Sequence, residues 1–152
     1  MNHMSAILML LALLVPATAQ AQAPAAVPAT LVNANTATPA ELSKVQGLNA
    51  AIVKALVSRR PFASMTALDT FLGEQTLTRE QRTELYERLF VPVNLNTASD
   101  ADILLIPRLG NRMLREFKEY RPYKAMEQFR REIGKYVGKV ELARLERYVT
   151  IS

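Results

Sequence analysis

The chain of 152 residues contains no cysteine and no tryptophan, and its single histidine is His3. Without cysteine there is no disulfide framework, no thiolate nucleophile and no lipid-attachment thiol. Since His3 lies at the extreme N-terminus, the rest of the chain also lacks imidazole for acid–base catalysis or zinc binding. The carboxylates are scattered among basic residues at spacings typical of solvated helix faces. We therefore expect a protein that is not an enzyme and that holds no metal or other cofactor.

Long apolar runs are also scarce, and the longest one lies near the N-terminus. Ala6 to Val15 is an unbroken run of ten apolar residues, about 15 Å long as a helix and too short for a hydrocarbon core of about 30 Å. Ala19-Gln20-Ala21 follows, with small residues at the positions that a signal peptidase recognises. Residues 1–21 are therefore predicted to be a signal peptide cleaved after Ala21, which makes the protein periplasmic or secreted, with no membrane segment after cleavage. An uncleaved N-terminal anchor is the alternative.

The remainder of the chain consists of a short linker and an internal repeat. Residues 22–32 are rich in alanine, proline and glutamine, a composition typical of a flexible tether. Asn33-Ala34-Asn35-Thr36-Ala37 then returns 61 residues later as Asn94-Leu95-Asn96-Thr97-Ala98, and 10 of the 41 positions beginning at Asn33 are identical without a gap. A fixed period indicates one supersecondary unit used twice. We expect the two copies at residues 33–92 and 93–152.

Each copy opens with a signal for the start of a helix. Thr38-Pro39-Ala40-Glu41 is a capping box with proline at the first helical position, and Ser99-Asp100-Ala101-Asp102 is its counterpart. The apolar residues that follow have helical spacing, and no segment alternates for long enough to predict a sheet. The sequence therefore predicts an all-α protein made of two tandem four-helix units. The last helices of the two units are expected to reach Leu89 and Tyr148.

A recurring asparagine precedes each capping box. Asn35 and Asn96 occupy equivalent positions in the extended segment that leads into the first helix of each copy. Asparagine side chains often hydrogen-bond nearby backbone groups. A bond from this segment to the start of its own helix explains the two asparagines as well as a ligand does.

The break between the first two helices of each copy resembles the helix-hairpin-helix motif. This break is Gln46-Gly47-Leu48-Asn49 in the first copy and Pro107-Arg108-Leu109-Gly110 in the second. With the opening Asn-x-Asn-Thr-Ala and the closing Arg-Pro-Phe or Arg-Pro-Tyr, it is similar to the exported ComEA-like DNA-uptake proteins. The segment from Val45 to Phe90 also resembles PsbU, the extrinsic lumenal subunit of photosystem II. The first resemblance implies DNA binding and the second implies binding to a protein.

Each break keeps one of the two glycines of the DNA-binding form. Gly47 matches the first glycine and Asn49 replaces the second, whereas Arg108 replaces the first and Gly110 matches the second. The resemblance implies that these glycines let backbone N–H groups at the start of the next helix approach a phosphate. A side chain at either position adds bulk near that approach, although an arginine also adds positive charge.

The positive charge of the chain is concentrated in its second copy. The chain carries a net charge of +5, of which residues 33–92 contribute 7 basic and 6 acidic side chains and residues 93–152 contribute 12 and 8. This imbalance favours an anionic partner for the second copy. The candidate DNA-binding residues there are Arg108, Gly110, Asn111, Arg112 and Arg115 around the break, and Gly134, Lys135, Gly138 and Lys139 before the last helix. The candidates in the first copy are Gly47, Asn49 and Lys54.

Each candidate group also has a structural interpretation. Glu116 and Glu119 lie four residues after Arg112 and Arg115, so the basic face could be a solvated row of ion pairs. The glycines of residues 134–139 are also expected wherever a loop joins two helices. We interpret the sequence as an exported, non-catalytic protein that binds DNA without sequence preference and takes no small-molecule substrate. The alternatives are a periplasmic protein-interaction module that does not bind DNA, and a structural spacer without a ligand.

Overall fold

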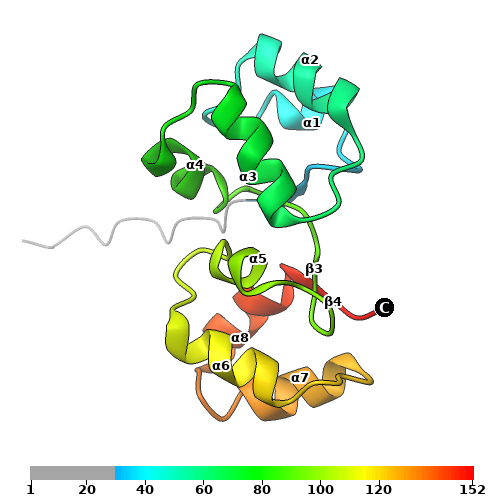
Figure 1. Ribbon diagram of the computed structural model, residues 1–152, viewed down its shortest axis with the longest axis vertical. Helices are drawn as coiled ribbons and strands as arrows, with labels where there is room; N and C mark the ends of the chain where they lie inside the picture. Colours follow the sequence, from blue (N-terminus) through cyan, green and yellow to red (C-terminus); the bar gives the residue numbers. More distant parts are fainter. Residues whose placement is uncertain (1–29) are drawn as a thin grey trace, which may run out of the picture.

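A computed structural model describes residues 30–152 of the chain. The predicted signal peptide and most of the predicted tether lie outside the described residues. Within them the protein is all-α, with short helices and four strands of two residues each, arranged as two units stacked along the long axis (Figure 1). The first unit comprises β1 (Val32–Asn33), α1 (Pro39–Leu42), α2 (Ala50–Arg59), α3 (Met65–Glu74), α4 (Arg79–Leu85) and β2 (Leu89–Phe90). The second comprises β3 (Val93–Asn94), α5 (Asp100–Leu104), α6 (Asn111–Glu119), α7 (Met126–Ile133), α8 (Lys139–Glu146) and β4 (Val149–Thr150).

The helices begin where their capping residues predict. Thr38 and Glu41 form a reciprocal capping box at α1, and Ser99 and Asp102 form the same box at α5. In each box the hydroxyl accepts a backbone hydrogen bond while the carboxylate accepts one in return, so two N–H groups that the helix leaves free are satisfied. No helix among residues 30–152 has both the length and the apolar character needed to cross a bilayer.

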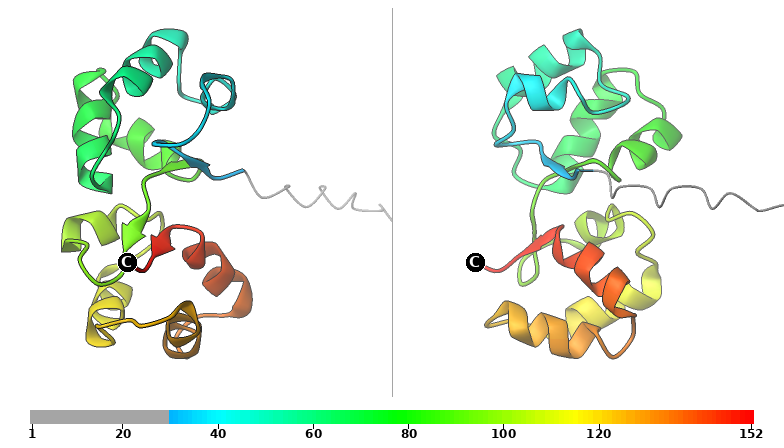
Figure 2. Two further views of the ribbon diagram at one scale, coloured as in Figure 1. Left: turned by 90° about the vertical axis from the view of Figure 1, so that its right-hand side faces the viewer. Right: turned by 180° about the vertical axis from the view of Figure 1, so that it is seen from behind.

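Two short strand pairs close the units, and the sequence did not predict them. β1 lies parallel to β2, with Val32 beside Leu89, and β3 lies parallel to β4, with Val93 beside Val149 (Figure 2). Strands of two residues are too short to show an alternating pattern. Because the chain enters these strands, α4 and α8 end at Leu85 and Glu146, a few residues before the predicted ends.

The recurring asparagines tie distant parts of each unit together. The Asn35 side chain donates to the Phe62 carbonyl at 2.9 Å and accepts from the Phe62 N–H at 2.8 Å. Asn96 makes the same pair of bonds to Tyr123, at 2.9 and 2.6 Å. The interpretation that these asparagines bond their own helix starts is therefore wrong. A partner 27 residues away satisfies both the oxygen and the nitrogen of the amide, which a local turn does not.

The two units pack against each other over a continuous core. Asp102 of α5 is 7% exposed, and its carboxylate accepts hydrogen bonds from the backbone N–H and the hydroxyl of Thr66, at 2.9 and 2.7 Å. Since Thr66 lies in the first turn of α3, one carboxylate caps helices in both units. The Tyr148 hydroxyl also donates to the Tyr86 carbonyl at 2.9 Å. These contacts hold the second unit in one orientation on the first.

Candidate nucleic-acid interface

The turns that precede α2 and α6 have the same backbone shape in spite of different residues. Gly47 has φ of +98°, and Arg108, its equivalent 61 residues later, has φ of +62°. An L-residue adopts this left-handed conformation only at a cost, whereas glycine adopts it freely. The second unit therefore keeps the hairpin turn of the first while replacing its glycine with a cation.

The helices that follow the turns differ between the units at their first residues. In the first unit the Asn49 side chain caps α2 by accepting from the Ile52 N–H at 2.9 Å, and Thr78 caps α4. In the second unit α6 and α8 begin after Gly110 and Gly138, and neither helix has a side-chain cap. An uncapped helix start offers backbone N–H groups and a partial positive charge to an outside anion. The second unit presents such a start at α6 and at α8, and also at α7, which begins after Ala125, whereas the first unit presents none before α2 or α4.

The glycines at these helix starts are not required by the fold. Gly110 and Gly138 have extended backbone with negative φ (−94° and −71°), which any residue adopts. A Cβ added at either glycine would meet no atom within 4 Å, so both face open space. Gly134 differs, because a Cβ there would lie 2.5 Å from the Arg130 carbonyl oxygen. Packing against α7 therefore explains Gly134, whereas nothing in the fold explains Gly110 and Gly138.

The basic side chains of α6 are not neutralised by the acidic residues that follow them. Within residues 30–152, neither Arg112 nor Arg115 forms an ion pair within 4 Å, so the pairs with Glu116 and Glu119 that the spacing suggested do not form. The Arg112 guanidinium instead lies 6.0 Å from the centre of the Tyr136 ring. Arg112 and Arg115 are both exposed and are available to an anion.

Tyr136 links the turn before α8 to Tyr120, the C-cap residue of α6. Its hydroxyl is hydrogen-bonded to the Tyr120 hydroxyl at 2.8 Å. This bond, with a smaller contribution from Glu116, raises the pKa of Tyr136 well above its ordinary value. Lys135 packs its ammonium 5.6 Å from the Tyr120 ring centre, and its hydrogen bond to Glu132 raises its pKa, so it stays charged. The turn before α8 is therefore held against the C-terminal end of α6.

Arg108 projects toward the first unit and toward α8. Its Nε lies 3.3 Å from Glu87 Oε1, and both side chains remain substantially exposed, at 62% and 40%. The pKa of Glu141, in the first turn of α8, is lowered mainly by hydrogen bonds from Arg144 and in smaller part by the charge of Arg108. Arg108 thus lies between a carboxylate of each unit, and an exposed pair of this kind is weak enough for a phosphate to displace.

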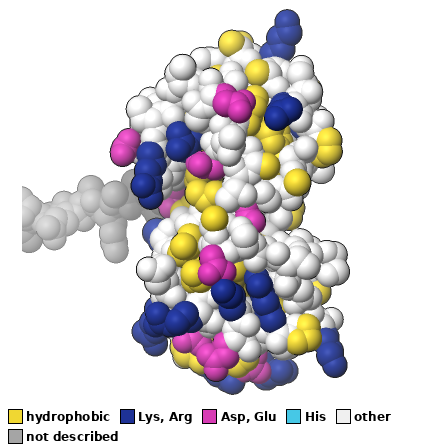
Figure 3. Space-filling model, viewed as in Figure 1, with side chains coloured by type: hydrophobic (Ala, Val, Ile, Leu, Met, Phe, Trp, Pro, Cys, Tyr) yellow, Lys and Arg dark blue, Asp and Glu magenta, His cyan; other side chains and the backbone are white. Residues whose placement is uncertain are grey.

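All the residues predicted to bind DNA lie at the surface, but they do not form one site. Those of the second unit surround the starts of α6 and α8, which both lie toward the left of the lower unit in Figure 1, while the left view of Figure 2 shows the two helices on either side of α7. In Figure 3 a cluster of Lys and Arg side chains lies at the left edge of the lower unit, where α6 begins in Figure 1. Gly47, Asn49 and Lys54 are exposed on the first unit. There the groove between the turns, of about 460 Å³, is lined by two carboxylates, Glu84 and Glu87, and one cation, Arg88, so its charge does not favour a phosphate.

One exposed apolar residue beside the site was not predicted. Val140, in the first turn of α8, is 88% exposed, whereas most valines of the described chain are buried or half-buried. It lies two residues before Leu142 and five before Leu145, so it does not share the apolar face of α8. It lies next to Lys139 and Gly138, where a contact with the sugar carbons of a nucleic acid would bury it.

Comparison with known proteins identifies the motif of the first unit. Residues 27–81 match the family model described as the helix-hairpin-helix motif. The match covers α1, the turn at Gly47, α2 and α3, which are the elements whose geometry is described above. Residues 27–81 are therefore similar to the helix-hairpin-helix motif, and this similarity suggests nucleic-acid binding in general. No curated protein and no solved structure is significantly similar to the chain.

Proposed function

We propose that this protein is an exported, non-catalytic DNA-binding protein that contacts phosphates through the second unit without sequence preference. The signal-like sequence of residues 1–21 supports export, and the resemblance to ComEA-like proteins supports a role in DNA uptake. The helix-hairpin-helix match supports nucleic acid as the ligand. The absence of cysteine from the chain, and of histidine beyond His3, supports a binding role rather than catalysis.

The observation that carries this proposal is the pair of uncapped helix starts in the second unit that are preceded by glycine. The N-termini of α6 and α8 lack side-chain caps, begin at glycines that face open space, and both lie toward the left of the lower unit in Figure 1. Each start can hold one phosphate on its backbone N–H groups. Arg112, Arg115 and Lys139 would then neutralise neighbouring phosphates. Since backbone amides and these cations read no base edge, binding of this kind carries no sequence information.

A DNA titration at several salt concentrations tests the proposal. The mature chain is expected to bind a labelled duplex with an affinity that falls steeply as salt rises, because each neutralised phosphate releases counterions. Removing Arg112 and Arg115 together (Arg112→Gln with Arg115→Gln) should reduce the slope of log K against log salt by about 2. The matched control replaces Arg59 and Lys124, exposed cations away from both turns, and should leave most of the slope unchanged. Binding that is absent at low salt, or equal losses in both variants, would refute the proposal.

Export is tested separately, by locating the mature chain in cell fractions. We expect a periplasmic or secreted product that begins at Gln22. A product that retains residues 1–21 in the membrane fraction would favour the uncleaved anchor.

One observation favours a second function for the first unit. Asn49 and Thr78 cap its helices from within, and its groove between the turns contains Glu84 and Glu87. A surface of this kind suits a protein partner better than DNA. If the chain is instead a protein-interaction module of the PsbU-like kind, affinity purification should recover a stable protein partner while DNA gel shifts remain blank.

A further inference from the structure

A cleft of about 490 Å³ lies between the two units, next to the turn that contains Arg108. Arg79, Arg82 and Tyr86, from α4 and the residue that follows it, line its first wall. Leu104 and the segment that follows it, up to Arg108, line its second wall. The cleft exists only because the units are packed together, and it opens beside the proposed DNA-binding turns.

Of the two arginines in the first wall, Arg82 is hydrogen-bonded within the unit and Arg79 is available to a ligand. Arg82 is engaged, since its Nε donates to Asp69 at 2.8 Å and its Nη1 donates to the Leu77 carbonyl at 2.7 Å. Tyr86 also donates to Asp69, at 2.6 Å, so the only carboxylate of the cleft is occupied. Arg79 is exposed and has no ion-pair partner within 4 Å in the described part of the chain. The cleft therefore has an unpaired guanidinium at its edge.

The second wall combines apolar surface with a second cation. Leu104 is 40% exposed. Among residues 30–152, Val140 is the one large apolar residue that is more exposed. Arg108 closes this wall and also belongs to the turn before α6. Two arginines separated by apolar surface match the alternation of phosphates and sugar carbons along a nucleic-acid strand.

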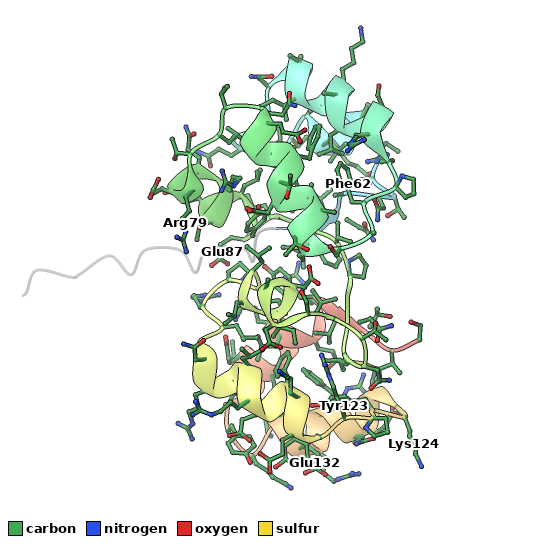
Figure 4. All side chains as sticks on the ribbon, in the orientation of Figure 1. Phe62, Arg79, Glu87, Tyr123, Lys124 and Glu132 are labelled. Atoms are coloured by element: carbon green, nitrogen blue, oxygen red, sulfur yellow. The ribbon has the colours of Figure 1, made fainter. Side chains whose placement is uncertain are left out.

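We propose that this cleft takes a sugar–phosphate segment of DNA, so that the strand held by the second unit continues onto α4 of the first. Arg79 and Arg108 contact successive parts of the backbone, and Leu104 packs against deoxyribose. Figure 4 shows Arg79 directed toward the second unit, on the side where the turn before α6 lies in Figure 1. The inference rests on the proposed DNA binding. It adds a DNA contact from the first unit, in which side chains cap the helices that follow the turns.

The test compares Arg79→Gln with Arg59→Gln in the mature chain. Both variants remove one exposed positive charge from the first unit, but Arg59 ends α2 and does not line the cleft. Arg79→Gln is expected to weaken DNA binding about threefold to tenfold and to lower the salt slope by about 1. Arg59→Gln should change affinity less than twofold. Equal effects of the two substitutions would overturn the inference.

A second substitution tests the apolar wall. Leu104→Glu places a carboxylate in the cleft and should weaken binding more than Leu104→Gln, which has the same shape without the charge. Because Leu104 is partly exposed, circular dichroism should confirm that both variants fold. If the carboxylate and the amide have the same effect, no backbone phosphate lies near Leu104 and the inference fails.

Two DNA substrates of equal length identify what enters the cleft. If a duplex lies across it, Arg79→Gln weakens binding of blunt duplex, whereas if an unpaired strand enters it, only binding of single-stranded DNA is weakened. Both results support the contact. If the wild-type protein binds DNA and Arg79→Gln binds both substrates equally well, the contact in the cleft is refuted but the proposed function is not. If the wild-type protein does not bind DNA at all, the proposed function is refuted.

Discussion

Arg108 holds the left-handed backbone conformation that Gly47 holds in the first unit, with φ of +62° and +98° at the two equivalent positions. For an L-residue this conformation costs about 1–2 kcal/mol relative to its preferred regions. The Arg108 side chain is 62% exposed and forms one surface ion pair, with Glu87, which contributes too little to offset that cost. A strained, exposed arginine is consistent with selection for binding rather than for stability.

The first prediction concerns this strain. Arg108→Gly should raise the free energy of unfolding by up to about 1 kcal/mol, because relief of the strained φ exceeds the added flexibility of the unfolded chain. The same substitution should weaken DNA binding, since it removes a cation from the turn. Arg108→Ala is the matched control, because it removes the cation but keeps a Cβ in the strained conformation. Urea unfolding and DNA titration should therefore separate the variants: both lose affinity, and only glycine gains stability.

The second prediction concerns the uncapped helix starts. Gly110→Ser and Gly138→Ser should each stabilise the fold by a few tenths of a kcal/mol, roughly the advantage of serine over glycine as an N-cap. Each should also weaken DNA binding, because the new hydroxyl occupies a backbone N–H that a phosphate would otherwise take. Thermal unfolding measures the first effect, and fluorescence anisotropy with labelled DNA measures the second.

Asn49→Gly in the first unit provides the control for these substitutions. It removes the cap of α2 and should lower stability by a few tenths of a kcal/mol without changing DNA affinity. If Asn49→Gly improves binding as much as the serine substitutions impair it, then both units contact DNA and the assignment to the second unit is wrong.

The third prediction concerns Glu87, which competes with phosphate for Arg108. Glu87→Gln should increase DNA affinity by roughly twofold to fivefold at low salt, since the 3.3 Å pair no longer has to be displaced. The control is Glu84→Gln, which removes an exposed carboxylate of α4 that does not pair with Arg108. Comparable gains from both substitutions would show a general charge effect instead of competition at Arg108.

The fourth prediction concerns Asp102 and the contact between the units. Burial acts to raise the pKa of Asp102, but hydrogen bonds from Ser99 and Thr66 together outweigh burial and hold the pKa below its ordinary value. Since the folded pKa is depressed, the stabilisation is complete above the unfolded pKa of about 4 and is lost as pH falls through the folded value. Asp102→Asn should lower the free energy of unfolding by about 1–3 kcal/mol at pH 7, and the difference from wild type should shrink below about pH 4.

Glu41→Gln provides the comparison for Asp102. Glu41 occupies the same capping position in α1, but it is exposed and bonds only to Thr38. Its loss should destabilise the fold less than the loss of Asp102, as measured by urea unfolding. If the two losses are equal, Asp102 acts only as a local cap, and the bonds to Thr66 contribute nothing to the contact between the units.

Features set by neighbouring residues could be predicted from the sequence. The capping boxes at Thr38 and Ser99 form as expected, because each depends on side chains three residues apart. The all-α fold follows from helical apolar spacing for the same reason. The strand pairs could not be predicted, since Val32 pairs with Leu89 and Val93 pairs with Val149 through the closure of each unit.

The candidate site divides in the same way. The sequence identified the glycines and cations at the turns and placed them at helix starts. It did not show that Tyr136 holds the turn before α8 against α6, or that Arg112 stacks on Tyr136 instead of pairing with Glu116. Arg79 was not a candidate, because it lies in the other unit and approaches Arg108 only across the cleft.

The sequence by itself determined the repeat, the positions of the helix starts, the excess of positive charge in the second half, the absence of cysteine and the single histidine. All of these depend on composition or on residues within a turn or two of each other. Only the tertiary structure decided that Asn35 bonds Phe62, that Asp102 caps a helix of the other unit, and that the starts of α6 and α8 both lie toward the left of the lower unit in Figure 1. These relationships join residues far apart in the chain, and their geometry is fixed by which apolar faces pack together.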